Sequence, residues 1–272
     1  MIQRIHDLSA YTDFLKPFFD EPRYAALTAE KRAEKWEKLQ KSAGEDGNLT
    51  LVSLDGDKPV GLFVFSNIEE EKYMELLFCF SHVKEAYDEL FSYLGEHRGG
   101  YTVDFVFDPE NTMLKSRLQA LGAHFWTEQQ IMTYTHVCPP VDVSDIVPLT
   151  PERRADYCAM HLTDTYWTGE KVADAPDRFK VFLALDGDKV VGYIDVTYTH
   201  EENEPFDLFV LPDFRRQGRG RKLLYKALVE NEPKGMLLFV DIDNLPAIKL
   251  YESSGFVKQE HQNLQSVRWQ VQ

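Results

Sequence analysis

The sequence predicts an α/β (α+β) protein built from two similar halves, and three observations lead to this prediction. A strand, a glycine-containing loop and a helix follow one another over residues 208–228. An apolar run at 236–240 precedes a helix that ends near Gly255. An eight-residue turn segment occurs twice, at 54–61 and 185–192. Strands that alternate with helices indicate sheets flanked by helices.

The first of these features predicts an anion site. The strand ends at Pro212, and the loop after it carries Gly218 and Gly220. Glycines at such a junction let backbone amides converge, and the positive end of the helix dipole helps them to hold a phosphate group. Four basic residues lie at the same end of the helix: Arg215, Arg219, Arg221 and Lys222. Cations in a first turn oppose the helix dipole, so a bound anion explains them better than an ordinary turn with solvated charges.

The second feature, the segment 236–255, predicts a strand followed by a capped helix. Asn244 suits the N-cap position, and Pro246 is tolerated in a first helical turn. Gly255 suits the left-handed residue that ends a helix. The segments 256–258 and 266–271 then read as a terminal pair of strands, because apolar residues alternate with polar ones in the second.

The third feature is an internal repeat. The segments 54–61 and 185–192 differ at one position of eight, and Asp-Gly predicts a hairpin turn in both. The spacing from Asn111 to Gly122 is also that from Asn244 to Gly255. We therefore predict two domains, at residues 1–138 and 139–272, divided near Pro139 and Pro140.

The first copy lacks the features that would bind phosphate. Its counterpart of the glycine loop, residues 81–90, has no glycine and carries Glu85, Asp88 and Glu89. Leu118 stands at the place of Tyr251. Carboxylates repel a phosphate group, so we predict no cofactor site here and expect the first domain to help shape the acceptor pocket.

The motif Arg215-x-x-Gly218-x-Gly220, followed at the right distance by Asn244, Tyr251 and Gly255-Phe256, resembles the GNAT superfamily of acyl-CoA N-acyltransferases. The resemblance covers the C-terminal half. It implies two tandem domains of this fold, each a mixed, mostly antiparallel sheet splayed at its central strands, with a degenerate first copy. It also implies acetyl-CoA as the acyl donor, its pyrophosphate held by the amides of residues 216–221. The cofactor-binding residues would be Val210, Arg215, Arg216, Gln217, Gly218, Arg219, Gly220, Arg221, Asn244 and Tyr251.

The same resemblance suggests catalytic roles. The amide of Val210 would face the developing oxyanion, and Tyr251 would protonate the departing thiolate, although a Tyr251 that only packs on the sheet is the alternative. Glu204 is the candidate general base. Its competitors are Asp207, Glu202, His200 and a water chain.

These roles predict direct transfer of an acetyl group to an amine in a ternary complex. A small-molecule acceptor is preferred over a protein N-terminus or a lysine. A non-catalytic acyl-CoA-binding or regulatory module is the alternative. The helical region 151–167, with Tyr157, Met160, His161 and Tyr166, would lie over the acceptor site or contribute to the core. A second helical region, 24–41, is expected to cover the sheet of the first domain.

Composition restricts partners and location. The net charge of −15 argues against nucleic acid as the main partner, and no apolar run approaches membrane-spanning length. The eight histidines are scattered, so we expect no metal site. Three cysteines without a paired framework suggest the reducing cytoplasm. A tandem pair can imitate a dimer within one chain, which favours a monomer.

Overall fold

The computed structural model describes residues 1–135, 138–161 and 167–272 of the chain. The chain divides into two compact units. Unit 1 comprises Met1–Gln129 and Glu260–Gln272, and unit 2 comprises Gln130–Gln259. The boundary predicted at 138/139 therefore misplaces two segments. The strand before Cys138 belongs to unit 2, and the C-terminal strand belongs to unit 1.

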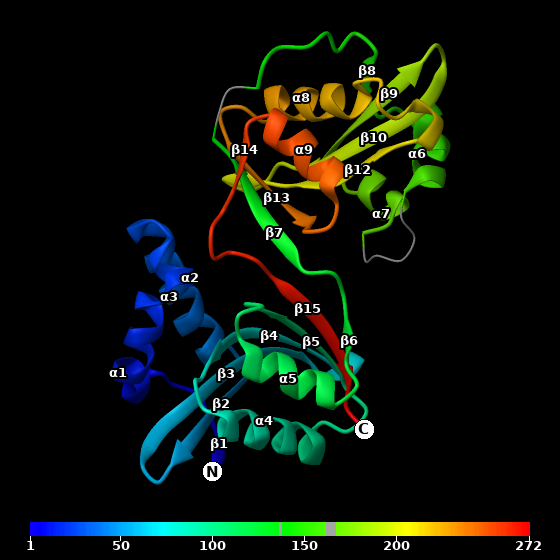
Figure 1. Cartoon of the computed structure of the whole chain (residues 1–272). Helices are drawn as coiled ribbons and strands as arrows, with labels where there is room; N and C mark the ends of the chain where they lie inside the picture. Colours follow the sequence, from blue (N-terminus) through cyan, green and yellow to red (C-terminus); the bar gives the residue numbers. More distant parts are fainter. Residues whose placement is uncertain (136–137, 162–166) are drawn as a thin grey trace. The chain divides into compact units, whose positions relative to one another are not determined.

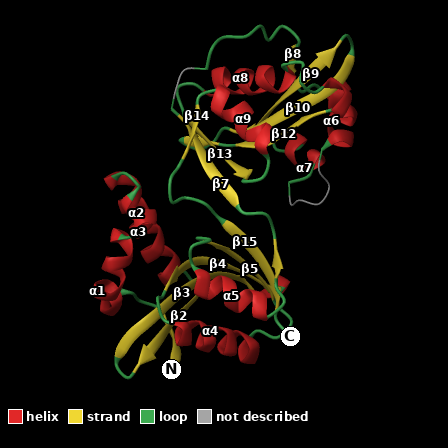
Figure 2. Cartoon of the chain, viewed as in Figure 1, coloured by secondary structure: helices red, strands yellow, loops and turns green. Residues whose placement is uncertain are grey.

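Unit 1 is a twisted sheet with helices on both faces (Figures 1 and 2). Its strands follow the order β1-β2-β3-β4-β5-β15-β6, and β4 and β5 run parallel while the other described pairs are antiparallel. The strands are β1 (Ile2–Ile5), β2 (Leu49–Asp55), β3 (Lys58–Ile68), β4 (Tyr73–Phe80), β5 (Thr102–Phe107), β6 (His124–Phe125) and β15 (Gln265–Gln270). The helices are α1 (Thr12–Leu15), α2 (Pro22–Ala25), α3 (Ala29–Gly44), α4 (Lys84–His97) and α5 (Thr112–Ala120).

Each face of this sheet has its own core. Residues of α4 and α5, such as Leu90 and Leu118, pack with Phe105 on one face. Residues of the N-terminal helices, such as Phe18 and Leu39, pack on the other face. The predicted helix over 24–41 is two helices, α2 and α3. The break precedes Thr28, whose hydroxyl accepts the amide of Lys31 and so starts a new helix.

Unit 2 contains two sheets, in the orders β12-β10-β9-β8 and β11-β13-β7-β14. Its strands are β7 (Gln129–Tyr134), β8 (Ile146–Pro148), β9 (Phe179–Asp186), β10 (Lys189–Thr197), β11 (Glu202–Asn203), β12 (Pro205–Val210), β13 (Gly235–Asp241) and β14 (Phe256–Lys258). Its helices are α6 (Arg154–Met160), α7 (Gly169–Ala173), α8 (Arg219–Asn231) and α9 (Leu245–Ser253). Helix α8 packs on one face of the first sheet and α6 on the other. The predicted fold class is confirmed.

The repeated local signals take the same form in both units. The hairpins turn at Gly56 and Gly187, whose φ angles are 58° and 61°. The last residue pairs before the turns are Asp55–Lys58 and Asp186–Lys189. Asn111 caps α5 and Asn244 caps α9, each accepting the backbone amide three residues on. These predictions from the sequence are confirmed.

The two units exchange one strand each. In unit 1, β15 lies between β5 and β6, and in unit 2, β7 lies at the same place between β13 and β14. The predicted pairing of 256–258 with 266–271 is therefore wrong. Val267 and Trp269 alternate inward as expected, but they are buried in the core of unit 1. Alternation identifies the buried face of a strand and leaves its partner open.

Candidate active site

The candidate site lies where β12 and β13 part. The short strand β11 runs parallel to β13, with the pairs Glu202–Gly235 and Asn203–Met236. Beyond Asn203 the chain leaves β13 and pairs with β10 in the other sheet. Glu204 therefore stands at the vertex of the gap. Val210 stands toward its open end, where the glycine loop begins.

The loop after β12 has the backbone of an anion nest. Arg216 and Gly218 have φ angles of 59° and 81°, in the left-handed region. Gly218 is the N-cap of α8 and offers no side chain to cap the helix. Alternation of left- and right-handed residues turns successive amides toward one side, and at a helix start they favour an anion. The geometry fits the predicted pyrophosphate site.

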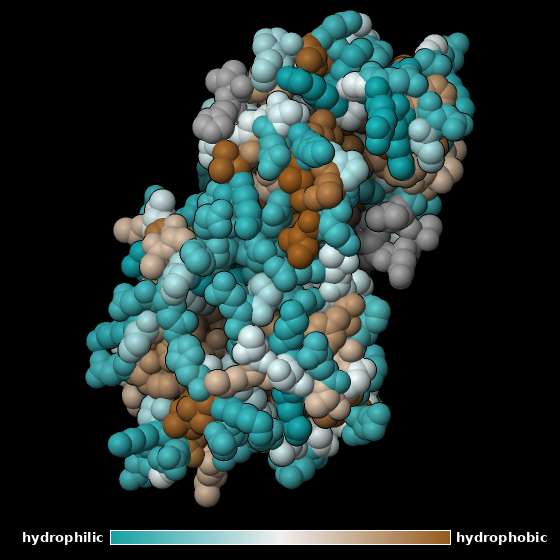
Figure 3. All heavy atoms as spheres, in the orientation of Figure 1, coloured by the Kyte–Doolittle hydropathy of each residue, from teal (hydrophilic) through white to brown (hydrophobic). Residues whose placement is uncertain are grey.

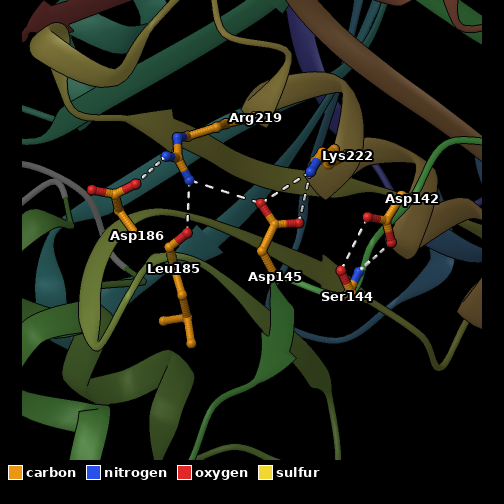
Figure 4. Close-up of polar contacts among 7 residues, drawn as sticks. All are labelled: Asp142, Ser144, Asp145, Leu185, Asp186, Arg219 and Lys222. Carbon is orange, nitrogen blue, oxygen red and sulfur yellow. Dashed lines mark hydrogen bonds and ion pairs between the residues drawn. The ribbon is translucent and has the colours of Figure 1, made fainter.

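Two of the basic residues in this region are held by carboxylates (Figure 4). Arg219 donates to Leu185 O at 2.7 Å and to Asp186 Oδ1 at 2.6 Å. Lys222 Nζ contacts Asp145 Oδ1 at 2.9 Å. Asp186 and Asp145 therefore neutralise two of the four cations that the sequence predicts to face a bound anion.

The other arginines of the loop differ in what they contact. Arg215 Nε donates to Val210 O at 2.7 Å, which ties the loop back to the strand. For Arg216 and Arg221, the described residues include no hydrogen-bond or ion-pair partner. Arg216 is exposed and Arg221 half-buried, so these two guanidinium groups can contact a bound anion, as can the terminal nitrogens of the exposed Arg215.

The two glycines of the motif serve different purposes. A Cβ at Gly218 would meet nothing within 4 Å, so this position requires glycine for its φ angle. A Cβ at Gly220 would lie 3.3 Å from Leu250 Cδ2 and 3.8 Å from Leu208 Cδ2. Gly220 therefore allows α8 to approach α9 and β12 closely.

The backbone N–H groups of β12 point alternately to the two sides of the strand. Leu211 N donates to Val191 O, so the adjacent pair Val210–Gly192 is a non-hydrogen-bonded pair. The amide of Val210 consequently points away from β10, toward the gap, and its role toward the oxyanion stays a prediction. By the same alternation the amide of Leu208 points into the gap. The sequence reasoning missed Leu208, because the register with β10 determines which amides face the gap.

Tyr251 lies on α9 and is half-buried beside Phe256, with ring centroids 5.9 Å apart. Burial raises the pKa of its phenol to about 12, and the negative charge of Asp207 adds to the shift. The hydroxyl therefore keeps its proton at neutral pH, as a general acid must.

Glu202, Glu204 and Asp207 are the half-buried carboxylates between residues 202 and 210. Burial raises the pKa of Glu204 to about 7. Burial also raises the pKa of Asp207, and the hydrogen bond from the Tyr193 hydroxyl, at 2.5 Å, opposes that rise. A carboxylate with a pKa near 7 is matched to taking a proton at neutral pH.

A buried polar cluster lies behind β12, and the sequence reasoning did not identify it. Asp195 of β10 is 0% exposed, and its Oδ2 accepts the Tyr157 hydroxyl at 2.7 Å and contacts His161 Nε2 at 3.0 Å. Tyr157 and His161, predicted to lie over the acceptor site or to contribute to the core, are both buried in this cluster. Tyr166 lies outside the described residues.

Unit 1 has the same parting strands without the glycine loop. Strands β4 and β5 pair from Tyr73–Thr102 to Leu76–Phe105 and then separate. A cavity of about 390 Å³ lies there, lined by residues that include Cys79 and Asn111. The turn into α4 has no left-handed glycine, and Glu85 occupies the first turn of the helix.

The molecular surface and the distribution of possible metal ligands do not point to a further group at this site. The face in Figure 3 is mainly hydrophilic, and brown residues gather where α9 and β13 meet, a region whose exposed apolar residues include Ile242 and Leu245. Within residues 1–135, 138–161 and 167–272, no three His, Cys, Asp or Glu side chains converge as metal ligands would. No helix in the same ranges is long and apolar enough to cross a membrane.

Comparison with known proteins places the glycine loop and α9 in one family domain. Residues 177–258 match the model of the acetyltransferase (GNAT) domain. The [ribosomal protein bS18]-alanine N-acetyltransferase of Escherichia coli K12 is 35% identical over 83 residues, which are 29% of this chain and 56% of that protein. Its Salmonella typhimurium counterpart is 38% identical over the same length. The chain thus spans about half the length of the curated relatives it matches.

Solved structures extend the likeness to the whole chain at the level of the fold. A GCN5-related N-acetyltransferase from Sphaerobacter thermophilus aligns with a TM-score of 0.60 and 17% identity, over 95% of this chain and 89% of that one. A tandem GNAT protein from the clavulanic acid biosynthesis pathway aligns with a TM-score of 0.53 and 13% identity, over 100% and 99%.

Proposed function

We propose that this chain, whose unit 2 carries a GNAT acetyltransferase domain, transfers an acetyl group from acetyl-CoA to an amine. The observation that carries the proposal is an anion nest at Arg216–Gly218 at the end of a strand whose amides at Leu208 and Val210 point into the gap. Tyr251 packs in the same core cluster as these two residues, and Glu204 lies directly before the same strand. The degenerate first copy contributes no second donor site in this proposal.

The donor would bind along the gap between β12 and β13. The amides of residues 216–221, together with Arg216 and Arg221, hold the pyrophosphate. On the side of the gap β12 has no partner strand, so the amides of Leu208 and Val210 can bind the polar groups of the pantetheine arm, which would take the place of a strand. One of them donates to the thioester oxygen, on which negative charge develops during attack.

The chemical step needs two proton transfers. A C–N bond forms between the amine nitrogen and the thioester carbon, and the C–S bond breaks. Glu204 accepts the proton that the amine loses, and Tyr251 gives a proton to the leaving thiolate. A lysine-like ammonium has a pKa of about 10.4, so its deprotonation near pH 7 costs roughly 4–5 kcal/mol, and placement against the thioester offsets much of this cost.

The acceptor is proposed to be a small-molecule amine. Carboxylates of β12 and a net charge of −15 favour a cationic acceptor. A protein N-terminus is the second candidate, because the matched relatives are named for acetylation of a ribosomal protein. We further propose that the chain acts as a cytoplasmic monomer. Its three cysteines are free, which suits a reducing compartment, and one chain holds both units.

Calorimetric titration of acetyl-CoA into the parent and into Gly218→Glu tests the donor site. One site in the parent that is lost in the variant supports the proposal, and absence of binding to the parent refutes it. An acceptor screen then compares amines with peptides by the mass gain of one acetyl group, using Tyr251→Phe as control. Binding without transfer to any acceptor would favour the alternative, a non-catalytic acyl-CoA-binding module.

A further inference from the structure

The buried carboxylate of Asp195 needs an explanation beyond packing. It is fully enclosed in unit 2, where its ion-pair partner among the described residues is the imidazole of His161, at 3.0 Å, and no lysine or arginine lies against it. A carboxylate loses its hydration on burial and is stable there only when hydrogen bonds replace the water. An apolar residue of similar size often serves stability as well, so a buried, hydrogen-bonded aspartate points to a geometric role.

The contacts of Asp195 join two elements that flank the candidate site. Its Oδ2 binds the end of α6 through Tyr157 and His161. Its Oδ1 accepts the backbone amide of Asp207 in β12, at 2.8 Å. One carboxylate thus ties α6 to the strand that carries the proposed catalytic groups.

The bond to Asp207 coincides with a bulge in β12. Asp195 pairs with Asp207, but the next residue of β10, Val196, pairs with Pro205, so Phe206 is the extra residue. A bulge bends its strand and redirects the side chains on either side.

Side chains of β10 satisfy the amides around this bulge. Asp207 N donates to Asp195, and Glu204 N donates to Thr197 Oγ1 at 2.8 Å. Pro205 has no amide hydrogen to place. Two polar side chains of β10 therefore accept the amide hydrogens on both sides of the extra residue.

The bulge separates the proposed base from the proposed amide donors. Glu204 lies before it, and Leu208 and Val210 lie after it. The Tyr193 hydroxyl adds a second bond on the same side, to the carboxylate of Asp207. The shape of the bulge therefore sets the position of Glu204 relative to the amides.

We propose that Asp195 is a positioning residue for the acetyl transfer, because its carboxylate holds the bulge of β12 and so aligns Glu204 with the gap-facing amides. The inference rests on the proposed function. It concerns a group that touches neither substrate and acts through the backbone of β12.

The test compares Asp195→Ala, Asp195→Asn and a matched control, Val196→Ala. Val196 is equally buried and neighbours Asp195 on β10, but it faces the core on the α8 side. We expect kcat of Asp195→Ala to fall about 100-fold, as for reacting groups misplaced by about 1 Å, with the dissociation constant for acetyl-CoA within threefold of the parent. Asp195→Asn keeps an oxygen for the Asp207 amide and should recover most of the loss. Val196→Ala should lose less than threefold.

Hydrogen exchange gives a readout that does not depend on activity. Peptides covering residues 204–211 should exchange faster in Asp195→Ala than in Val196→Ala, while peptides of α8 stay protected. If Asp195→Ala fails to fold, Thr197→Val, which removes only the second acceptor, should lower kcat about tenfold and loosen the same peptides. Parental kcat together with parental exchange in these variants would overturn the inference. A parent that transfers no acetyl group refutes the proposed function, and the exchange comparison still decides whether Asp195 holds the bulge.

Discussion

Lys222 in the first turn of α8 and Asp145 before β8 form an ion pair, with Nζ 2.9 Å from Oδ1 and 3.1 Å from Oδ2. Asp145 also lies 3.8 Å from Arg219. The segment that precedes β8 thus brings a negative charge to the end of α8 where the donor phosphates are proposed to bind. It offsets cations that would otherwise repel one another and the helix dipole.

Removing this charge should strengthen donor binding. In Asp145→Asn, Arg219 and Lys222 lose a shared counter-charge, so acetyl-CoA should bind about two- to fivefold more tightly at low salt, the size expected of a partly exposed pair. The gain should shrink at higher ionic strength. Calorimetry at two salt concentrations measures it. Asp142→Asn is the comparison, because Asp142 hydrogen-bonds Ser144 and its charge acts on Lys222 without forming an ion pair with it, so its gain should be smaller. Weaker binding by Asp145→Asn would show that Asp145 positions the two cations for the ligand.

The two loop glycines should respond differently to substitution. Gly218→Ala forces an alanine into the left-handed region at φ 81°, with open space around it, so it should cost about 1–2 kcal/mol of stability and leave the fold intact. Gly220→Leu should lower the melting temperature more, because its side chain meets Leu250 and displaces α9. The expectation from the sequence motif treats the two positions alike. Equal melting temperatures for the two variants would contradict the packing role of Gly220.

We expect the pH–rate profile of acetyl transfer to have an acid limb, a range in which the rate rises with pH, because Glu204 must lose its proton to act as the base. Its pKa of about 7 means that the carboxylate form, which accepts the proton, fills as the pH rises through 7, so kcat/KM should rise over the same range. Glu204→Gln should lower the rate about 10²–10⁴-fold and flatten this limb. A limb that persists in Glu204→Gln would exclude Glu204 as the base and leave Asp207, Glu202, His200 or a water chain in that role.

The raised pKa of Glu204 should also make the free energy of unfolding depend on pH. A carboxyl pKa raised from 4.5 to about 7 means that folding favours the neutral form. The stability is complete below the unfolded pKa and falls as the pH rises toward 7. At pH 8 the penalty approaches about 3 kcal/mol, at about 1.4 kcal/mol per pKa unit. Glu204→Gln should therefore raise the melting temperature at pH 8 and change it little at pH 4. A variant less stable than the parent at pH 8 would argue against this burial cost.

Tyr251→Phe should separate binding from chemistry. The change removes one hydroxyl and keeps the ring against Phe256, so acetyl-CoA should bind as before. The thiolate would leave without its proton donor, and kcat should fall about 10²-fold or more. The measurement pairs steady-state kinetics with calorimetry. Unchanged kcat would assign Tyr251 to packing alone.

The sequence predicts the local parts of the site well. The glycine loop, the cap at Asn244 and the hairpin at Gly187 each depend on residues close in the chain, whose conformational preferences are strong. These features need no knowledge of distant partners.

Long-range pairings lie beyond the sequence patterns. The ion pair between Lys222 and Asp145 joins residues far apart in the chain, as does the bond between Tyr157 and Asp195. A polar residue within an apolar strand, as Asp195 is, was the available signal for the buried cluster. It does not reveal which groups satisfy the charge, because that depends on how α6 and β12 pack.

The exchanged strands affect when each unit can complete its folding during synthesis. The sheet of unit 1 needs β15 between β5 and β6, and β15 lies after all of unit 2 in the sequence. While the ribosome is still translating residues 130–259, the emerging first unit lacks this strand, and the inner edges of β5 and β6 have no partner. The earlier half can therefore reach its final form only after the later half has been synthesised, so a nascent chain stalled before residue 265 would expose sheet edges to chaperones and aggregation.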